Sequence, residues 1–264
     1  IASLAHTEKG SYGLATRVTT NATRVEKGWH INGQKTCILH GDCANLLIVS
    51  ARTSGNRDDV SGISLFVIEA QSTNIQIASY DLHDGLRAAD ITFDMIYVPD
   101  SALLGSLGHG FPILRVAEYE AIAAVCAEAV GVMSELHQMT VDYLKQRQQF
   151  GVPIGQFQAL QHRAADMYIA LEQARSMAMY AAMMSQSEDE TARMQAISAA
   201  KVQIGRSAKL IGEEAVQMFG GIGVTMEFKA GHYFKKLTLL DQFLGHADHH
   251  LELLTAGPGL FEID

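Results

Sequence analysis

The hydrophobic positions of this chain follow two different periods, and the period changes near residues 105 to 110. Before that point, short runs rich in β-branched and aromatic residues are separated by clusters of Gly, Asp and Ser, a pattern typical of strands in a β-sandwich or barrel. These runs cover residues 46–49, 63–68, 91–93 and 96–99. We therefore predict a β domain over residues 1–107.

From Phe111 onward the apolar residues recur at the helical spacing of three and four. One run ends at Arg147, and two later stripes follow it. The second stripe contains Phe157, Leu160, Ala164, Met167, Leu171, Ala174 and Ala178, and the third contains Ile197, Ala200, Ile204, Ala208, Ile211, Ala215 and Met218. Gly151 and Pro153 interrupt the pattern after the first run, as in the connection between antiparallel helices. The fold class predicted is α+β multidomain, with a four- to five-helix up-down bundle over residues 108–264.

Two connections carry a local signal. Asn32-Gly33 lies between two runs of the β domain and predicts a type I′ hairpin turn, because such a turn needs positive φ at both central residues. The connection that begins at Arg147 carries the guanidinium of that residue, two amide side chains (Gln149 and Gln158) and the phenyl ring of Phe150. That is more binding chemistry than a turn requires. Taken alone, however, Arg147 also fits a cation that interacts with the dipole at a helix C-terminus.

Composition and charge exclude several classes of protein. A hydrophobic content of 48% and a charged content of 19% are typical of a globular protein, and no run of 18 apolar residues predicts a membrane span. A net charge of -9 argues against nucleic acid as the main partner. The three cysteines, Cys37, Cys43 and Cys126, lack CxxC spacing. Free thiols in a reducing cytoplasm are therefore expected, without disulfides or a zinc site.

Five motifs, in this order, resemble those of acyl-CoA dehydrogenases: HTEKGSYG, HINGQK, DGLRAADITFDMIYVP, RQQFG followed by FQALQH, and QMFGGIGVTMEF. The resemblance covers the chain from Ala5 to about Leu251. It implies a middle β-barrel domain followed by a C-terminal helical bundle. The family's N-terminal helical domain is expected to lie outside these residues, and truncation or processing would explain a first residue of Ile1.

The resemblance also implies a cofactor and a reaction. Family members bind FAD between subunits and oxidise the Cα–Cβ bond of an acyl-CoA thioester. Arg147 matches the arginine that holds the pyrophosphate of a flavin bound mainly by the neighbouring subunit, a task suited to the two-pronged guanidinium. The remaining matches to FAD contacts are Thr7, at the flavin ring, and Gln149, Phe150, Gln158, Gln217 and Gly221.

The chain departs from the family around the flavin ring and at the catalytic base. Cys37 and Leu39 stand where the family has an aromatic and a hydroxyl residue, and Leu39 cannot donate a hydrogen bond to the flavin. The reaction needs a carboxylate whose pKa is raised toward neutrality. The two positions that supply it in the family are occupied here by Leu244 and Ala121, so no catalytic residue is predicted. Glu120 lies next to the second position, but one helical step turns a side chain by about 100°.

The histidine-rich segment 245–250 offers a weaker candidate. His246, His249 and His250 have helical spacing with Asp248, but a single helical cluster rarely supplies a complete metal site, so no metal is predicted. His246 stands where the family has a small hydroxyl residue near FAD. We expect it to pack and hydrogen-bond around the flavin or at a subunit interface.

A chain that keeps the pyrophosphate contact but lacks the base resembles the small subunit of heteromeric, pimeloyl-type acyl-CoA dehydrogenases. The base and ring pocket would then belong to the other polypeptide. The alternatives are a homotetramer with a displaced base, Glu120 or His246, and an inert structural subunit. The resemblance further implies a role in lipid metabolism, an acyl-CoA substrate, an electron-transfer flavoprotein or similar acceptor, and a homo- or hetero-tetramer.

Overall fold

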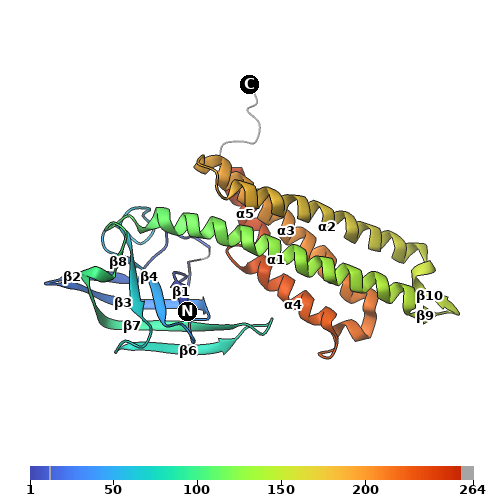
Figure 1. Ribbon diagram of the computed structural model, residues 1–264, viewed down its shortest axis with the longest axis horizontal. Helices are drawn as coiled ribbons and strands as arrows, with labels where there is room; N and C mark the ends of the chain where they lie inside the picture. The colour runs from blue at the N-terminus through green and yellow to red at the C-terminus, as the bar shows by residue number, and fades with distance from the viewer. Residues whose placement is uncertain (12, 257–264) are drawn as a thin grey trace, which may run out of the picture. The chain divides into compact units, whose positions relative to one another are not determined.

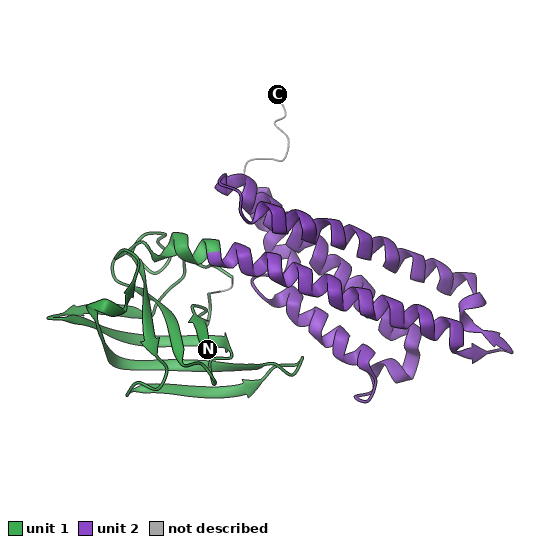
Figure 2. Cartoon of the chain, in the orientation of Figure 1, with its two compact units in different colours: residues 1–116 green, residues 117–264 purple. Residues whose placement is uncertain are grey.

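A computed structural model describes residues 1–11 and 13–256 of the chain. The chain divides into a sheet unit, residues 1–116, and a helical unit that begins at Ala117 (Figure 2). The division predicted at residues 107 and 108 precedes the first helix, whereas the sheet unit includes the first turns of that helix. Leu114 accounts for this difference, because it is buried with Val18, Ile63 and Leu65.

The sheet unit is one eight-stranded sheet (Figure 1). Its strands are β1 (Ala2–Ala5), β2 (Asn21–Val25), β3 (Gly28–Leu39), β4 (Leu46–Arg52), β5 (Ile63–Glu69), β6 (Ile75–Asp81), β7 (Arg87–Pro99) and β8 (Leu103–Leu104). They lie in the order β6-β7-β3-β2-β4-β5-β8, and β1 pairs in parallel with β4. The strands predicted at 46–49 and 63–68 are confirmed, and the two short runs after residue 90 form one long strand, β7.

The hairpin predicted at Asn32-Gly33 is wrong. The chain turns at residues 26 and 27, between the paired residues Val25 and Gly28, and β3 continues through Asn32 and Gly33. Gly33 instead lies at a shift in the β3–β7 register, a β-bulge. A Cβ atom there would lie 2.6 Å from the Cα of Thr20, so the glycine permits a close backbone approach.

The helical unit is a bundle whose long helices lie side by side (Figure 1). Its elements are α1 (Gly110–Gln146, which begins in the sheet unit), β9 (Gln148–Gln149), β10 (Val152–Pro153), η2 (Ile154–Gln156), α2 (Gln158–Met184), α3 (Glu190–Phe219), η3 (Gly220–Val224), α4 (Lys229–Gln242) and α5 (Ala247–Ala256). Asp189 caps α3 by accepting hydrogen bonds from two backbone amides of its first turn. Within the described residues, no helix combines the length and apolarity needed to cross a membrane.

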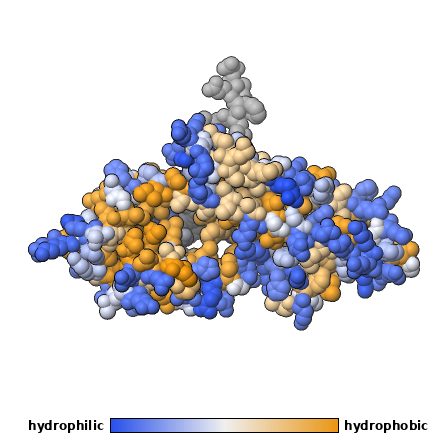
Figure 3. Space-filling view, viewed as in Figure 1, coloured by the Kyte–Doolittle hydropathy of each residue, from blue (hydrophilic) through white to orange (hydrophobic). Residues whose placement is uncertain are grey.

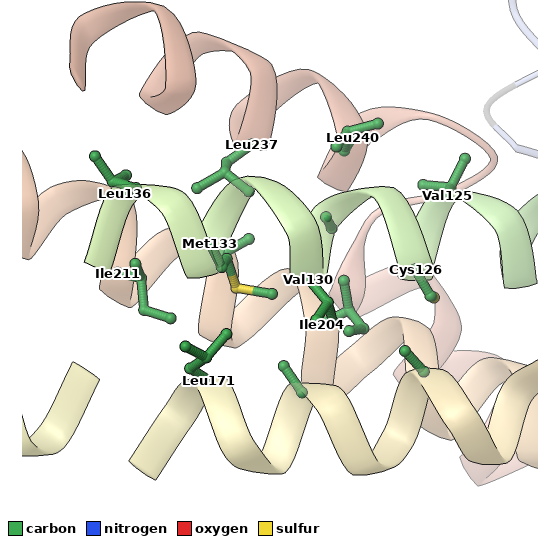
Figure 4. Close-up of a cluster of buried hydrophobic side chains, with 14 of the residues drawn as sticks. Val125, Cys126, Val130, Met133, Leu136, Leu171, Ile204, Ile211, Leu237 and Leu240 are labelled. Atoms are coloured by element: carbon green, nitrogen blue, oxygen red, sulfur yellow. The ribbon is translucent and has the colours of Figure 1, made fainter. Parts of the chain in front are cut away.

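The predicted stripes form the core of the bundle. All seven positions of the third stripe are buried on α3, and the second stripe is buried from Met167 onward. Figure 4 shows Met133 of α1, Leu171 of α2 and Ile204 of α3 within one cluster of buried side chains. Helical periodicity therefore identified the buried faces of α2 and α3 correctly.

Candidate functional site

The turn that follows α1 presents Arg147 to solvent. The helix ends at Gln146, and the backbone of Arg147 is fixed on both sides: its N–H donates to the carbonyl of Tyr143 (2.8 Å) and its carbonyl accepts from the N–H of Ile154 (2.8 Å). Its side chain is exposed, and its guanidinium makes no hydrogen bond or ion pair with the rest of the described chain. A fixed backbone with an unpaired guanidinium suits the binding of an external anion.

Beyond Arg147 the chain makes a two-residue turn at Phe150 and Gly151, between the paired residues Gln149 and Val152. Both turn residues have positive φ, 55° and 84°. Such a backbone is costly for a phenylalanine, and its ring is 91% exposed, with only an edge contact to Phe157 at 6.1 Å between ring centroids. The turn thus holds an aromatic ring out in solvent.

The predicted amide contacts are exposed as well. Gln149 donates from its side chain to the carbonyl of Gln148, and Gln158 begins α2. On the face drawn in Figure 3, this end of the bundle is mostly hydrophilic. Its polar side chains can therefore exchange water for a polar ligand at modest cost.

The glycine corner after α3 lies at the same end of the bundle. Tyr143, one turn before the end of α1, stacks on Phe219 at the end of α3 with 4.8 Å between ring centroids, and its hydroxyl donates to the Phe219 carbonyl (3.4 Å). Phe219 also contacts Phe228, which precedes α4, at 4.8 Å. This aromatic cluster fixes the arginine turn and the glycine corner to one another.

The corner itself is open. Gly220 ends α3 with φ of 65°, and no atom lies within 4 Å of a Cβ built on Gly220 or Gly221. Nothing in the described chain therefore requires glycine at 221, which is consistent with a backbone left bare for close approach by a ligand. Gln217, one turn earlier, is exposed. A pyrophosphate-bearing dinucleotide fits this combination of open backbone and unpaired guanidinium.

The predicted flavin-ring residues lie in the sheet unit. Thr7 is exposed, and its carbonyl accepts from the N–H of Thr36 (2.8 Å). Cys37 follows at a second register shift with φ of 53°, and its N–H donates to Asp90 (3.0 Å). Leu39 is half-buried, and its backbone carbonyl accepts from the hydroxyl of Ser3. Its side chain offers no donor at the position where the family has a hydroxyl.

At the first base position, Leu244 occupies a left-handed corner between α4 and α5, with φ of 60°. Its side chain packs against the bundle core, and its carbonyl accepts from Nε2 of the buried His250 (2.9 Å). Lys201, also buried, donates to the carbonyls of Leu240 (2.7 Å) and Asp241 (2.8 Å) just before the corner. Several hydrogen bonds thus fix the backbone of this corner, although the Leu244 side chain that it carries cannot accept a proton.

The other candidate bases are no better placed. Ala121 has no titratable group, and the carboxylate of Glu120 accepts a hydrogen bond from the side chain of Gln186, between α2 and α3. His246 accepts the backbone N–H of His249 at Nδ1 (3.2 Å). Within the described residues, no group of three or more His, Cys, Asp or Glu side chains is arranged to hold a metal ion.

Sequence reasoning missed a buried polar network beside Thr7. The Lys35 ammonium, with no exposed side-chain surface, donates to the Glu8 carboxylate (2.7 Å), the Ser50 hydroxyl (2.9 Å) and the carbonyl of His6 (3.1 Å). Ser50 also shares a hydrogen bond with Nδ1 of His6 (2.8 Å). The sequence signal was that Lys35 continues the alternating pattern of Trp29 and Ile31, two inward-facing positions of β3, where lysine is rare without a partner.

The network shifts the pKa of each of its members. Burial of the Lys35 ammonium lowers its pKa to about 8, although Glu8 opposes the shift. Burial would raise the pKa of Glu8, but the charge of Lys35 and hydrogen bonds from Lys35, Thr19 and Thr20 lower it to about 2. Burial and the charge of Lys35 lower the pKa of His6 to about 4. At neutral pH the network holds one ion pair and a neutral imidazole.

Known proteins resemble the chain over nearly its whole length. Isovaleryl-CoA dehydrogenase, mitochondrial, of Solanum tuberosum is 27% identical over 99% of this chain, which spans 63% of that relative. The structure of butyryl-CoA dehydrogenase from Megasphaera elsdenii matches with a TM-score of 0.89 at 26% identity, over 97% of this chain and 67% of that one. A structure of PigA with FAD and proline matches with a TM-score of 0.89 at 29% identity, with the same coverage.

Two domain families match directly. The acyl-CoA dehydrogenase middle domain covers residues 3–96, and the acyl-CoA dehydrogenase C-terminal domain covers residues 108–257. These matches correspond to the sheet and the helical bundle described above. The chain belongs to the acyl-CoA dehydrogenase family.

Proposed function

We propose that this chain is the subunit without a catalytic base in a heteromeric, FAD-dependent acyl-CoA dehydrogenase. The assembly would resemble the pimeloyl-type enzymes. One contrast carries the proposal. The exposed Arg147 and the open glycine corner keep the features expected of a dinucleotide site, whereas Leu244 and Ala121 cannot remove a proton. The chain therefore combines features of a cofactor site with no base at either of the family's two positions.

Each part of the site has a distinct task in this proposal. Arg147 pairs with the pyrophosphate of a flavin held mainly by the partner subunit, and the bare backbone at Gly221 lets the dinucleotide approach. Gln149, Phe150, Gln158 and Gln217 surround the nucleotide portion, and Thr7 contacts a flavin ring. FAD, when bound, supplies the two-electron acceptor for oxidation of the Cα–Cβ bond. The partner supplies the carboxylate that takes the α proton of the acyl-CoA.

In this proposal, the flavin passes its electrons to an electron-transfer flavoprotein or a similar acceptor. The assembly is a tetramer in the cytoplasm. The three-dimensional likeness to a PigA structure that holds FAD supports the choice of cofactor. The engagement of Glu120 by Gln186 and of His246 by His249 argues against a homotetramer that uses either residue as its base.

Flavin content separates the three candidate functions. The chain is purified alone and after co-expression with a family member that carries the glutamate base, and bound flavin is measured by visible absorbance. Flavin only in the co-expressed assembly is the result expected. Flavin in the chain alone would favour the homotetramer, and its absence from both would favour an inert structural subunit.

The arginine is tested within the flavin-bearing assembly. Arg147→Ala should weaken FAD binding at least tenfold, because a charge-assisted hydrogen bond contributes about 1.5–3 kcal/mol. Arg206→Ala is the matched control, since Arg206 is also exposed in the helical unit and makes no hydrogen bond or ion pair with the described residues. Equal flavin affinity in the two variants would remove Arg147 from the site.

A further inference from the structure

Thr7 is an exposed residue between two anchored neighbours. His6, on one side, is tied to Ser50 through Nδ1 and to Lys35 through its carbonyl. Glu8, on the other, is buried and accepts hydrogen bonds from Lys35, from the backbone N–H of Thr19 (2.7 Å) and from that of Thr20 (3.0 Å). The single ammonium of Lys35 therefore binds the backbone carbonyl of His6 and the side chain of Glu8, the two residues that flank Thr7.

The direction of the hydrogen bonds follows from the lysine. An ammonium can only donate, so Ser50 Oγ accepts from Lys35 and its own proton is free for Nδ1 of His6. Burial and the charge of Lys35 lower the pKa of His6 to about 4, so its imidazole is neutral at pH 7. Hydrogen bonds thus link Lys35, Ser50 and the ring of His6, the residue before Thr7.

The strand that carries Lys35 also contacts Thr7 directly. Thr36, the next residue, donates its N–H to the carbonyl of Thr7 (2.8 Å). The left-handed Cys37 follows it, at the position where the family has its aromatic residue. Displacement of Lys35 would therefore move both the Thr7 segment and the edge of β3 beside it.

We propose that Lys35, acting with Glu8 and Ser50, is a positioning residue that fixes the hydroxyl of Thr7 for contact with a flavin ring. The inference rests on the proposed function, because Thr7 enters it as a flavin contact. A buried ion pair is a weak source of stability but a strong source of geometric definition, since its groups must all be satisfied together. In this chain, the Lys35–Glu8 ion pair would fix the position of one exposed side chain, that of Thr7.

Three variants test the proposal. Lys35→Met alone leaves a buried carboxylate unpaired, so the double variant Glu8→Gln/Lys35→Met carries the main test, and Ser50→Ala breaks the link to His6 while it keeps the ion pair. Lys27→Met is the matched control, because Lys27 is exposed in the turn between β2 and β3. All are compared by amide hydrogen exchange and by flavin binding in the flavin-bearing assembly.

In the double variant we expect the Thr36 amide to exchange about tenfold faster, as for a segment that loses one hydrogen-bonded anchor. The amides of β3 near Trp29 should be unchanged, so that local release is distinguished from general unfolding. Ser50→Ala should show a smaller effect in the same segment. Exchange at Thr36 within twofold of wild type would overturn the proposal.

The flavin readout tests the purpose of this positioning. At saturating flavin we expect the affinity for the FAD that Thr7 of this chain contacts to fall about tenfold, and the visible band of that flavin to shift, in the double variant, with neither change in Lys27→Met. Faster exchange at Thr36 with an unaltered flavin spectrum and affinity would show that Lys35 orders the segment without serving the flavin. Absence of flavin from the wild-type assembly would instead refute the proposed function, while the exchange result would still decide the role of Lys35 in ordering Thr7.

Discussion

At the scale of single residues, the buried network of the sheet unit makes stability depend on pH. His6 is held neutral in the folded state with a pKa of about 4, against 6.5 when unfolded. Between these values the unfolded chain binds a proton that the folded chain does not. The stability that neutral His6 contributes is therefore complete above pH 6.5 and is lost as the pH falls to 4.

We predict that the sheet unit loses up to ~3 kcal/mol of unfolding free energy between pH 6.5 and 4, on the basis of the His6 shift. The single tryptophan, Trp29, lies in this unit, so its fluorescence reports urea unfolding there. His6→Gln removes the titration and should flatten the dependence between pH 6.5 and 5. Below pH 4.5 a further loss should persist in both proteins, because Glu8 also binds a proton as the pH falls to 2. A variant as sensitive as wild type at pH 5 would contradict this assignment.

Two helical glycines differ only in their surroundings, and they make a matched pair. Gly131 of α1 has no atom within 4 Å of a Cβ built on it. A Cβ on Gly205 of α3 would lie 2.1 Å from Oδ1 of Asp241, an atom that also accepts the N–H of Ala247. Gly131→Ala should raise the free energy of unfolding by ~0.5–1 kcal/mol, whereas Gly205→Ala should lower it by ~1–2 kcal/mol. Thermal unfolding followed by far-ultraviolet circular dichroism measures both, and shifts of the same sign would contradict the contact.

At the scale of elements, periodicity predicted the helices well and local turn chemistry predicted poorly. The stripes on α2 and α3 were identified because helical burial repeats over many residues. Asn32-Gly33 misled because the same two residues also suit a β-bulge, and only the close approach of Thr20 distinguishes the two. The turn with two positive φ angles that does follow α1 uses Phe150 and Gly151, and no propensity rule favours phenylalanine there.

Residues of the candidate site were predictable only where they belong to a sequence motif. Arg147, Gln217 and Gly221 were predicted from their motifs, and the aromatic contact between Tyr143 and Phe219 holds the arginine turn and the glycine corner at one end of the bundle. The Lys35 network was missed because Lys35, Ser50 and the His6–Glu8 segment lie far apart in the sequence, and only the folded sheet brings them together. The same is true of Lys201 and His250, which support the Leu244 corner from α3 and α5.

That corner supports a prediction about Leu244→Glu. His250 and Lys201 hold the backbone through carbonyls, so the corner should keep its shape with glutamate in place of leucine. The variant should fold normally and still show little turnover of an acyl-CoA panel, because Leu39 leaves the flavin edge without its donor. Assays use an assembly whose partner base is replaced by glutamine.

Adding Leu39→Thr to Leu244→Glu should raise that turnover about a hundredfold, the usual contribution of one well-placed donor. Leu39→Thr alone is the control and should remain inactive, since it restores the donor without the base. Strong turnover from Leu244→Glu by itself would show that the ring pocket of this chain is better preserved than Leu39 suggests.

At the scale of the whole molecule, the proposed roles of its residues predict an unequal assembly. Arg147 would complete a flavin site that belongs mainly to the partner, whereas this chain provides neither a hydrogen-bond donor at Leu39 nor a base at Leu244 for a second flavin. A flavin held by fewer contacts binds more weakly, with about tenfold lower affinity for each 1.4 kcal/mol lost.

Native mass spectrometry of the co-expressed assembly should therefore find two FAD molecules for each pair of unlike chains at saturating flavin, and one after dialysis has removed the more weakly bound flavin. Arg147→Ala in this chain should then lower the FAD affinity of the partner's site at least tenfold and lower turnover at limiting flavin, although the altered residue lies in the subunit without a base. A partner variant that lacks its own matching arginine is the control and should leave the occupied site filled, because that arginine would serve the weaker site. Two flavins retained per pair after dialysis, or loss of flavin only in the control, would show that the sites are equivalent or assigned to the wrong subunits.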